Sequence, residues 1–140
     1  MYNIEKKDYG YKLIFAGELH KDEMDQWLKE SEQILSSQEG NFAVFVDMRK
    51  MQPASQVVQK FFQRGQSLYC RKGMERSAVI LSSPALSMQF KRIAVQSGIF
   101  DGERYIDAST TSDWEEIGLS WVSDSIEPGS ITRTILTDCR

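Results

Sequence analysis

The chain has little of the chemistry that marks metal sites, disulfide frameworks and nucleophilic catalysis. Its 140 residues include two cysteines, Cys70 and Cys139, and one histidine, His20. Structural metal sites need several such ligands at defined spacing, and nucleophilic triads need a histidine beside the nucleophile. No GxGxxG or GxxxxGK[ST] motif is present to hold a nucleotide. We therefore expect free thiols, no metal, no cofactor, no catalytic residues and no enzymatic activity.

Long hydrophobic runs and net positive charge are also missing. The longest uninterrupted apolar run is FAVFV (42–46), far shorter than the roughly 20 residues of a membrane span. The first ten residues, MYNIEKKDYG, carry charges where a signal peptide would be apolar. Lys and Arg number 17 against 20 acidic residues, which gives a net charge of −3 and no overall field that attracts phosphate backbones. We expect a cytoplasmic protein with no transmembrane segment and no nucleic-acid partner.

Hydrophobic periodicity predicts strands and helices in alternation. A turn at Asp8–Gly10 predicts an opening hairpin, and FAVFVDMR (42–49), apolar on both faces, predicts a strand inside a sheet with helices on both sides. Gly65, inside a predicted helix, costs about 1 kcal/mol relative to Ala, which indicates close packing against a neighbour. The remaining elements are a charged helix around Met24–Leu35, a helix from Ser55 to about Lys72, a strand at 77–83, a helix from Pro84 to Gly98, a strand at 104–109 and a helix after Asp113.

The resulting order, β-β-α-β-α-β-α-β-α, predicts a single α/β domain. Alternating strands and helices favour a largely parallel sheet, here closed at one side by the hairpin. The domain is expected to span residues 1–124. Residues 125–140 contain Pro-Gly and few large apolar residues, so they are expected to form a tail that is loose or docked on this or another subunit.

Candidate site residues lie past the carboxyl ends of the predicted strands, where open parallel sheets bind ligands. Asp47 closes a buried strand and needs partners among nearby N–H groups or Arg49; it either serves a ligand or ties down its own loop. Ser55 either caps the next helix or presents its N-terminus to an anion. Asp107 follows another strand at the same edge.

Two further groups have both a structural and a functional interpretation. Basic residues around the second and third predicted helices could form an anion-binding surface or a solvated helix face; they are Arg71, Lys72, Arg76, Lys91 and Arg92. The aromatic residues Phe61, Phe62, Trp114 and Trp121 either fill the core or surround an apolar ligand.

The residues at the element junctions resemble the STAS and SpoIIAA-like superfamily, which includes the antagonists of anti-sigma factors. FAVFVDMRKMQPAS (42–55) is similar to the third-strand region of that superfamily. Over about residues 1–122 the chain resembles the small stand-alone bacterial SpoIIAA-like proteins, through VDMR (46–49), ERSAVILSS (75–83), QFKRIAVQSG (89–98), RYIDAS (104–109) and DWEEIGLSW (113–121). The resemblance implies a mixed β-sheet with about four helices, packed mainly on one face.

The resemblance also implies a function. True antagonists carry a phosphorylatable serine in a D-S-[ST]-G type loop, and Ser55 falls at about that position, without the preceding Asp and following Gly. We expect a non-enzymatic regulatory or protein-interaction module, with a partner or ligand surface that includes Asp47, Arg49, Ser55, Phe62 and Arg92. The alternative is a protein that binds or senses a small hydrophobic or lipid-like ligand. The partner is therefore an unidentified protein or a small apolar molecule, and a homodimer is left open.

Overall fold

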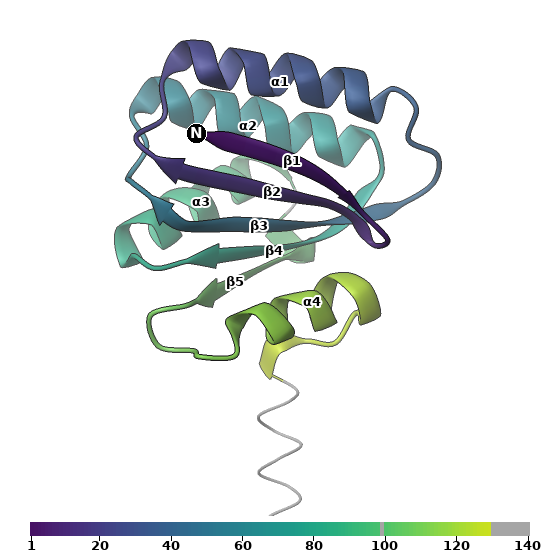
Figure 1. Ribbon diagram of the computed structural model, residues 1–140, viewed down its shortest axis with the longest axis vertical. Helices are drawn as coiled ribbons and strands as arrows, with labels where there is room; N and C mark the ends of the chain where they lie inside the picture. Colours follow the sequence, from purple (N-terminus) through teal and green to yellow (C-terminus); the bar gives the residue numbers. More distant parts are fainter. Residues whose placement is uncertain (99, 130–140) are drawn as a thin grey trace, which may run out of the picture.

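Strands and helices alternate along the chain in the order that the hydrophobic pattern predicts (Figure 1). The computed structural model describes residues 1–98 and 100–129. Within these ranges the α/β class is confirmed. The elements are β1 (Tyr2–Lys7), β2 (Gly10–Gly17), α1 (Lys21–Leu35), β3 (Phe42–Met51), α2 (Gln56–Arg71), β4 (Met74–Leu81), α3 (Pro84–Ser97), a 3₁₀ turn (Phe100–Gly102), β5 (Glu103–Asp107) and α4 (Trp114–Asp124).

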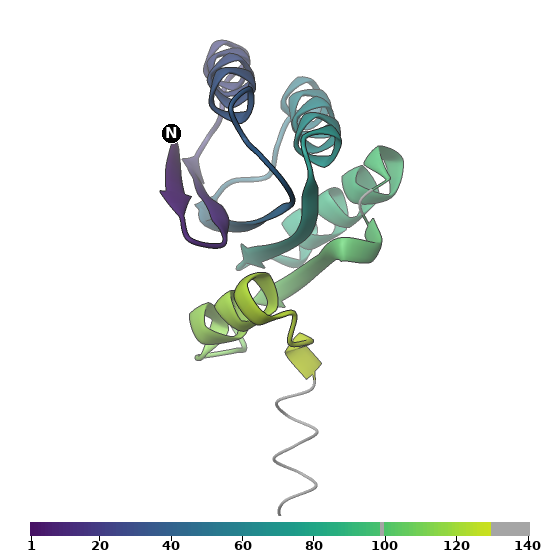
Figure 2. The same cartoon turned by 90° about the vertical axis from the view of Figure 1, so that its right-hand side faces the viewer.

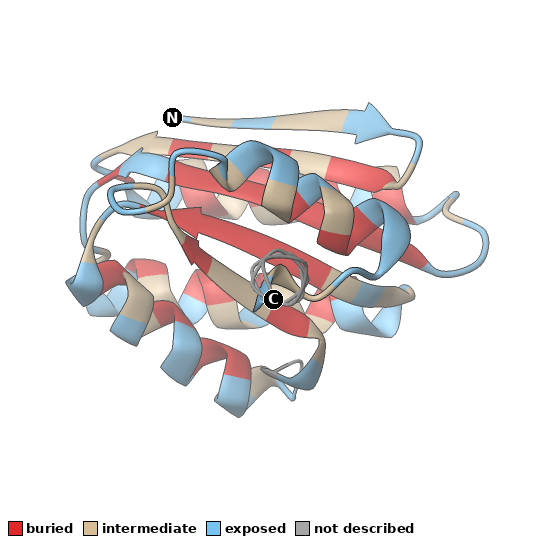
Figure 3. Ribbon diagram, turned by 90° about the horizontal axis from the view of Figure 1, so that it is seen from below, coloured by how far each residue is buried: buried red, intermediate tan, exposed pale blue. Residues whose placement is uncertain are grey.

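The strands form one mixed sheet in the spatial order β1-β2-β3-β4-β5. β1 is antiparallel to β2, and the other neighbouring pairs are parallel. β3 lies in the middle of the sheet, as its apolar sequence predicts, and continues to Met51, two residues beyond the expected end. The opening hairpin forms one side of the sheet, so β1 is partly exposed while the central strands are buried (Figure 3).

Helices cover both faces of the sheet unequally. α1, α2 and α3 pack on one face and α4 packs alone on the other (Figures 1 and 2). Successive residues of a strand point to opposite faces, so Val44 and Val46 of β3 join the large core under α1–α3, whereas Ala43 and Phe45 join the smaller core under α4. Both faces of β3 are therefore apolar because both are covered.

Other boundaries also differ from the sequence prediction: β4 ends at Leu81 rather than residue 83, and β5 spans Glu103–Asp107 rather than 104–109. β4 begins at Met74 rather than residue 77, because Met74 pairs with Phe42 of β3 although the residues after it are polar. The expected tail begins at residue 125, yet Glu127 forms an ion pair with Arg104 of β5, so the first residues after α4 remain attached to the domain. Residues 130–140, with Cys139, lie outside the described ranges.

Candidate functional site at the carboxyl edge of the sheet

Four parallel strands end at the same edge of the sheet. β2, β3, β4 and β5 run in one direction, and each leads into a loop followed by a helix. Such an edge is the usual binding position in open α/β sheets, because the loops there are not engaged in strand pairing. The loop between β3 and α2, residues 52–55, lies at this edge.

Asp47 does not close β3 as expected but lies inside the strand, opposite Ile14 of β2 and Ile80 of β4. It forms a two-point ion pair with Arg49. Arg49 Nε donates to Oδ1 of Asp47 at 3.0 Å, Nη2 donates to Oδ2 at 2.9 Å, and the Arg49 backbone N–H donates to Oδ1 at 3.1 Å. Burial raises the pKa of the Asp47 carboxyl, but the hydrogen bonds from Arg49 outweigh burial and hold the pKa below its usual value. The guanidinium also lies 4.0 Å from the ring centre of Trp114 in α4. The predicted partners of Asp47 are confirmed, and the pair joins β3 to α4.

Ser55 is the N-cap of α2. Its Oγ accepts a hydrogen bond from the backbone N–H of Val58 at 3.2 Å, which satisfies one of the free amides of the first turn. The predicted capping role is therefore confirmed, and the residue remains exposed to solvent.

The loop before Ser55 is fastened to α3. The backbone N–H of Ala54 donates to Oε1 of Gln89 at 3.1 Å, and Nε2 of Gln89 donates back to the Ala54 carbonyl at 3.3 Å. Nε2 of Gln59 donates to the same carbonyl at 2.9 Å. These bonds give the loop one defined position between α2 and α3.

Two large apolar side chains close in sequence to the residues that hold this loop are exposed to solvent. Val57, in the first turn of α2, is 48% exposed, and Met88, which precedes Gln89 in α3, is 74% exposed. We name residues 52–57 and Met88 the edge surface. It combines a fixed loop with apolar side chains that have no cover within the described chain.

Asp107 is engaged within its own loop. Its Oδ1 accepts a hydrogen bond from the Ser109 backbone N–H at 2.9 Å and another from the Ser109 hydroxyl. These bonds lower the pKa of the Asp107 carboxyl. Asp107 therefore stabilises local backbone at the end of β5.

Phe62 does not reach the surface. Its side chain is 2% exposed, and its ring packs edge-on against Phe15 and Phe90 with ring centres 4.9 Å and 4.8 Å away. The prediction that Phe62 contributes to an outer partner surface is wrong, because α2 turns this residue toward the sheet. It lines an internal cavity of about 40 Å³ instead.

That cavity lies between the sheet and the three helices. Two buried polar atoms at its wall, Nε1 of Trp27 and Oε1 of Gln66, have no hydrogen-bond partner among the described residues. About 40 Å³ is enough for one or two waters, whereas an apolar cavity of roughly 150 Å³ is needed to hold benzene. The cavity as it stands suits a bridging water and lends no support to an apolar ligand.

Arg92 is exposed on α3, beside a groove between α2 and α3. Lys91, Arg71 and Lys72 are also exposed on these two helices or at their ends. Arg76 does not belong with them: its guanidinium donates to the Trp121 and Val122 carbonyls at 3.1 Å, at the end of α4. Arg76 therefore points to the other side of the sheet, and the remaining basic residues do not form one cluster: Arg71 lines a groove between α1 and α2, whereas Arg92 lines the groove between α2 and α3.

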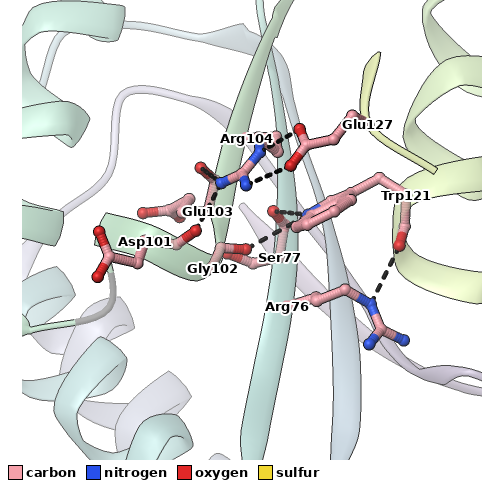
Figure 4. A network of polar contacts seen from close by, with 8 residues as sticks. All are labelled: Arg76, Ser77, Asp101, Gly102, Glu103, Arg104, Trp121 and Glu127. Atoms are coloured by element: carbon pink, nitrogen blue, oxygen red, sulfur yellow. Dashed lines mark hydrogen bonds and ion pairs between the residues drawn. The ribbon is translucent and has the colours of Figure 1, made fainter. Parts of the chain in front are cut away.

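A second polar network, which sequence reasoning missed, surrounds the amino end of β5 (Figure 4). Nε1 of Trp121 donates to the carbonyl of Ser77 at 3.1 Å and to that of Gly102 at 3.3 Å. Arg104 holds the carboxylate of Glu127 through two bonds, at 2.7 Å and 2.6 Å. The partners are 19 to 44 residues apart in the sequence, so no local pattern indicates these contacts.

Glu103 is a buried carboxyl in the same region. Burial raises its pKa from the ordinary 4.5 to about 7, although hydrogen bonds from Tyr105 and Ser77 act in the opposite direction. The hydroxyl of Tyr105 donates to Oε2 of Glu103 at 2.9 Å. Alternation along β5 could have found this residue, since positions 103 and 105 share the face toward α3.

Among residues 1–98 and 100–129, no three His, Cys, Asp or Glu side chains gather as metal ligands. His20 is an exposed residue before α1 and makes no side-chain capping bond there. Cys70 is a free, exposed thiol in α2. Within the same ranges, every helix is too short or too polar to cross a membrane.

Comparison with known proteins gave no family. No protein-family model matches the chain, and a search of curated proteins found no match.

Proposed function

We propose that this chain is a non-enzymatic regulatory or protein-interaction module of the SpoIIAA-like, STAS-like type, acting in the cytoplasm. Its partner surface is the edge surface. The observation that carries the proposal is the loop at residues 52–55, which is fixed to α2 and α3 by side chains of Gln59 and Gln89, with Val57 and Met88 exposed close in sequence to the residues that hold it.

Preorganisation is the physical reason why this surface suits a protein partner. A loop that is already held in one conformation loses little conformational entropy when a partner binds. Exposed apolar side chains contribute further, because a partner that covers Met88 removes apolar area from water. Such a surface supports binding without any chemistry at its centre.

Support for the family comes from the residues at the element junctions. VDMR (46–49) precedes the loop, and Ser55 opens the helix where the antagonists carry their phosphoserine. Here Ser55 is engaged as a cap, and the sequence PASQ lacks the flanking Asp and Gly. We therefore propose partner binding without a phosphorylation switch.

Affinity capture from extract of the cells that encode the chain tests this proposal. Wild type is compared with Met88→Asp and with Leu119→Asp, which introduces the same charge at a 37% exposed apolar residue on α4. We expect Met88→Asp to lose partners that wild type and Leu119→Asp both retain. Identical captured proteins for all three, or none for wild type, would refute the proposal.

A further inference from the structure

Charge is distributed very unevenly over the helices. α2 and α3 contain no Asp or Glu, and their charged residues are Lys60, Arg64, Arg71, Lys91 and Arg92. α1, by contrast, has five acidic residues against two lysines, and the whole chain has a net charge of −3. The side of the molecule formed by α2 and α3 is therefore positive on a chain that is negative overall.

None of these five cations is neutralised by an ion pair in the part of the chain that the structure describes. All five are exposed. Arg64 lies over the ring of Phe61 and lines a hollow with Glu32, and Lys91 lies over the ring of Tyr105 and lines a hollow with Asp101. Among the described residues, Lys60 and Arg92 line a groove that contains no carboxylate. An anionic partner would supply the missing carboxylates.

A groove of about 390 Å³ runs between α2 and α3 in the centre of this positive side. Lys60 lines it from α2, and Arg92 lines it from α3. Four glutamines, Gln56, Gln59, Gln63 and Gln96, line the rest of the groove together with Ile93. Each glutamine amide can both donate and accept hydrogen bonds, so the groove suits the polar side chains of a peptide segment.

Next to Arg92, α3 also has exposed apolar side chains that do not line the groove. Met88 is 74% exposed and Val95 is 61% exposed. They are seven residues apart, which places them on one side of the helix two turns from each other. Arg92 lies between them in the sequence, so cationic and apolar groups alternate along the exposed side of α3.

We propose that the groove between α2 and α3 binds an acidic amphipathic helix of a partner protein. Its apolar side chains would cover Met88 and Val95, and its Glu or Asp residues would meet Lys60 and Arg92. A helix in a groove between two helices is a common recognition mode. This inference rests on the proposed function, because the groove begins at the edge surface, where Gln56 belongs to both. It adds the chemical character of the partner that the surface binds.

The observations favour a peptide over an anionic membrane. Helices that lie on membranes insert Trp, Phe or Leu, whereas the large aromatic and leucine side chains of α2 and α3 are buried: Phe61, Phe62, Leu68, Tyr69, Leu86 and Phe90. The surface is also hollowed between the helices, which fits a convex helix better than a flat bilayer.

Fluorescence anisotropy with a defined probe tests the inference. The probe is a synthetic, stapled amphipathic helix with Leu along one face and Glu along the other, added to the full chain at low salt. We expect binding that weakens as salt is added, and that falls about tenfold or more in Lys60→Glu/Arg92→Glu. The control Lys7→Glu/Lys21→Glu makes the same change in net charge on β1 and α1 and should bind as wild type does.

Three results would overturn the inference: equal binding of the same peptide with Lys in place of Glu, equal losses in both charge-reversal variants, or binding only to vesicles of phosphatidylcholine and phosphatidylglycerol. Changes in the NMR chemical shifts of the backbone amides, measured on the labelled protein, map the residues that the peptide contacts. We expect these changes along α2 and α3. Changes confined to α1 or α4 would contradict the inference. If the peptide fails while Met88→Asp still loses partners from extract, the groove assignment is wrong and the interaction module stands.

Discussion

Trp27 of α1 occupies the space that a side chain at Gly65 of α2 would need. A Cβ at Gly65 would lie 2.1 Å from Cη2 of Trp27 and 2.4 Å from Cζ3. The glycine therefore allows α2 to approach the indole ring closely, and the cost of glycine in a helix is offset by this packing.

Gly65→Ala is expected to destabilise the protein despite the higher helix propensity of Ala. Overpacking against Trp27 costs about 1–3 kcal/mol, and helix propensity returns about 1 kcal/mol. The free energy of unfolding, measured in urea, should therefore fall by about 1 kcal/mol and by no more than about 2 kcal/mol. Trp27→Phe removes the outer ring, and in that background Gly65→Ala should cost less. An equal cost in both backgrounds would show that the indole contact is not the cause.

Asp47→Asn is expected to lower the free energy of unfolding by about 1–3 kcal/mol at pH 7, because the Arg49 guanidinium loses its charged acceptor. The pKa of Asp47 is lowered in the folded state, so its contribution is present above the pKa of the unfolded chain and lost as the pH falls through the folded value. Urea unfolding should therefore distinguish wild type from Asp47→Asn at pH 7 and much less at pH 2. Glu39→Gln, at an exposed carboxylate, is the control, and a loss of the same size there would contradict the prediction.

Glu103 is expected to make the protein less stable as the pH rises. Its pKa is raised to about 7 in the folded state from an ordinary 4.5, so the folded state holds a proton that the unfolded state releases. The associated stability, about 3 kcal/mol, is present below pH 4.5 and lost by about pH 7.

Glu103→Gln removes this titration while keeping a similar shape. Thermal unfolding between pH 4 and pH 8 should show a smaller decline with pH for the variant than for wild type. Parallel curves for the two proteins would mean that Glu103 titrates normally in the folded state.

Ser55→Ala should cost about 1 kcal/mol of stability through loss of the N-cap, and Ser55→Asp, which can also cap a helix, should cost less. Chemical denaturation measures both. Equal losses for the two variants would show that the bond to the Val58 amide contributes little.

The sequence predicts those features that depend on local pattern. Alternation and apolar runs predicted β3 as the middle strand, and the need of a buried carboxylate for partners predicted that Asp47 binds nearby N–H groups or Arg49. Gly65 was predicted to mark a close approach of its helix to a neighbouring element, because a glycine inside a helix is otherwise unfavourable relative to alanine. Phe62 was predicted both as a core aromatic and as part of the partner surface; its burial confirms the first and contradicts the second, and its neighbours Phe15 and Phe90 come from other elements.

Contacts between distant segments account for the rest. Arg76 was placed in the basic cluster by its neighbours in the sequence, but its partners are carbonyls at the end of α4. The stacking of Arg49 on Trp114 and the ion pair of Arg104 with Glu127 also require knowledge of how α4 crosses the sheet. The sequence likewise does not predict that the positively charged helices α2 and α3 lie side by side with a groove between them, because this depends on how the two helices pack.

Site-specific photo-crosslinking in living cells tests the edge surface most directly. A photoreactive amino acid replaces Met88 in one protein and Leu119 in another, and covalent adducts are identified by mass spectrometry after illumination. A protein that crosslinks at position 88 and not at 119 is the predicted result. Adducts of the same protein at both positions, or none at position 88, would contradict a partner at this edge of the sheet.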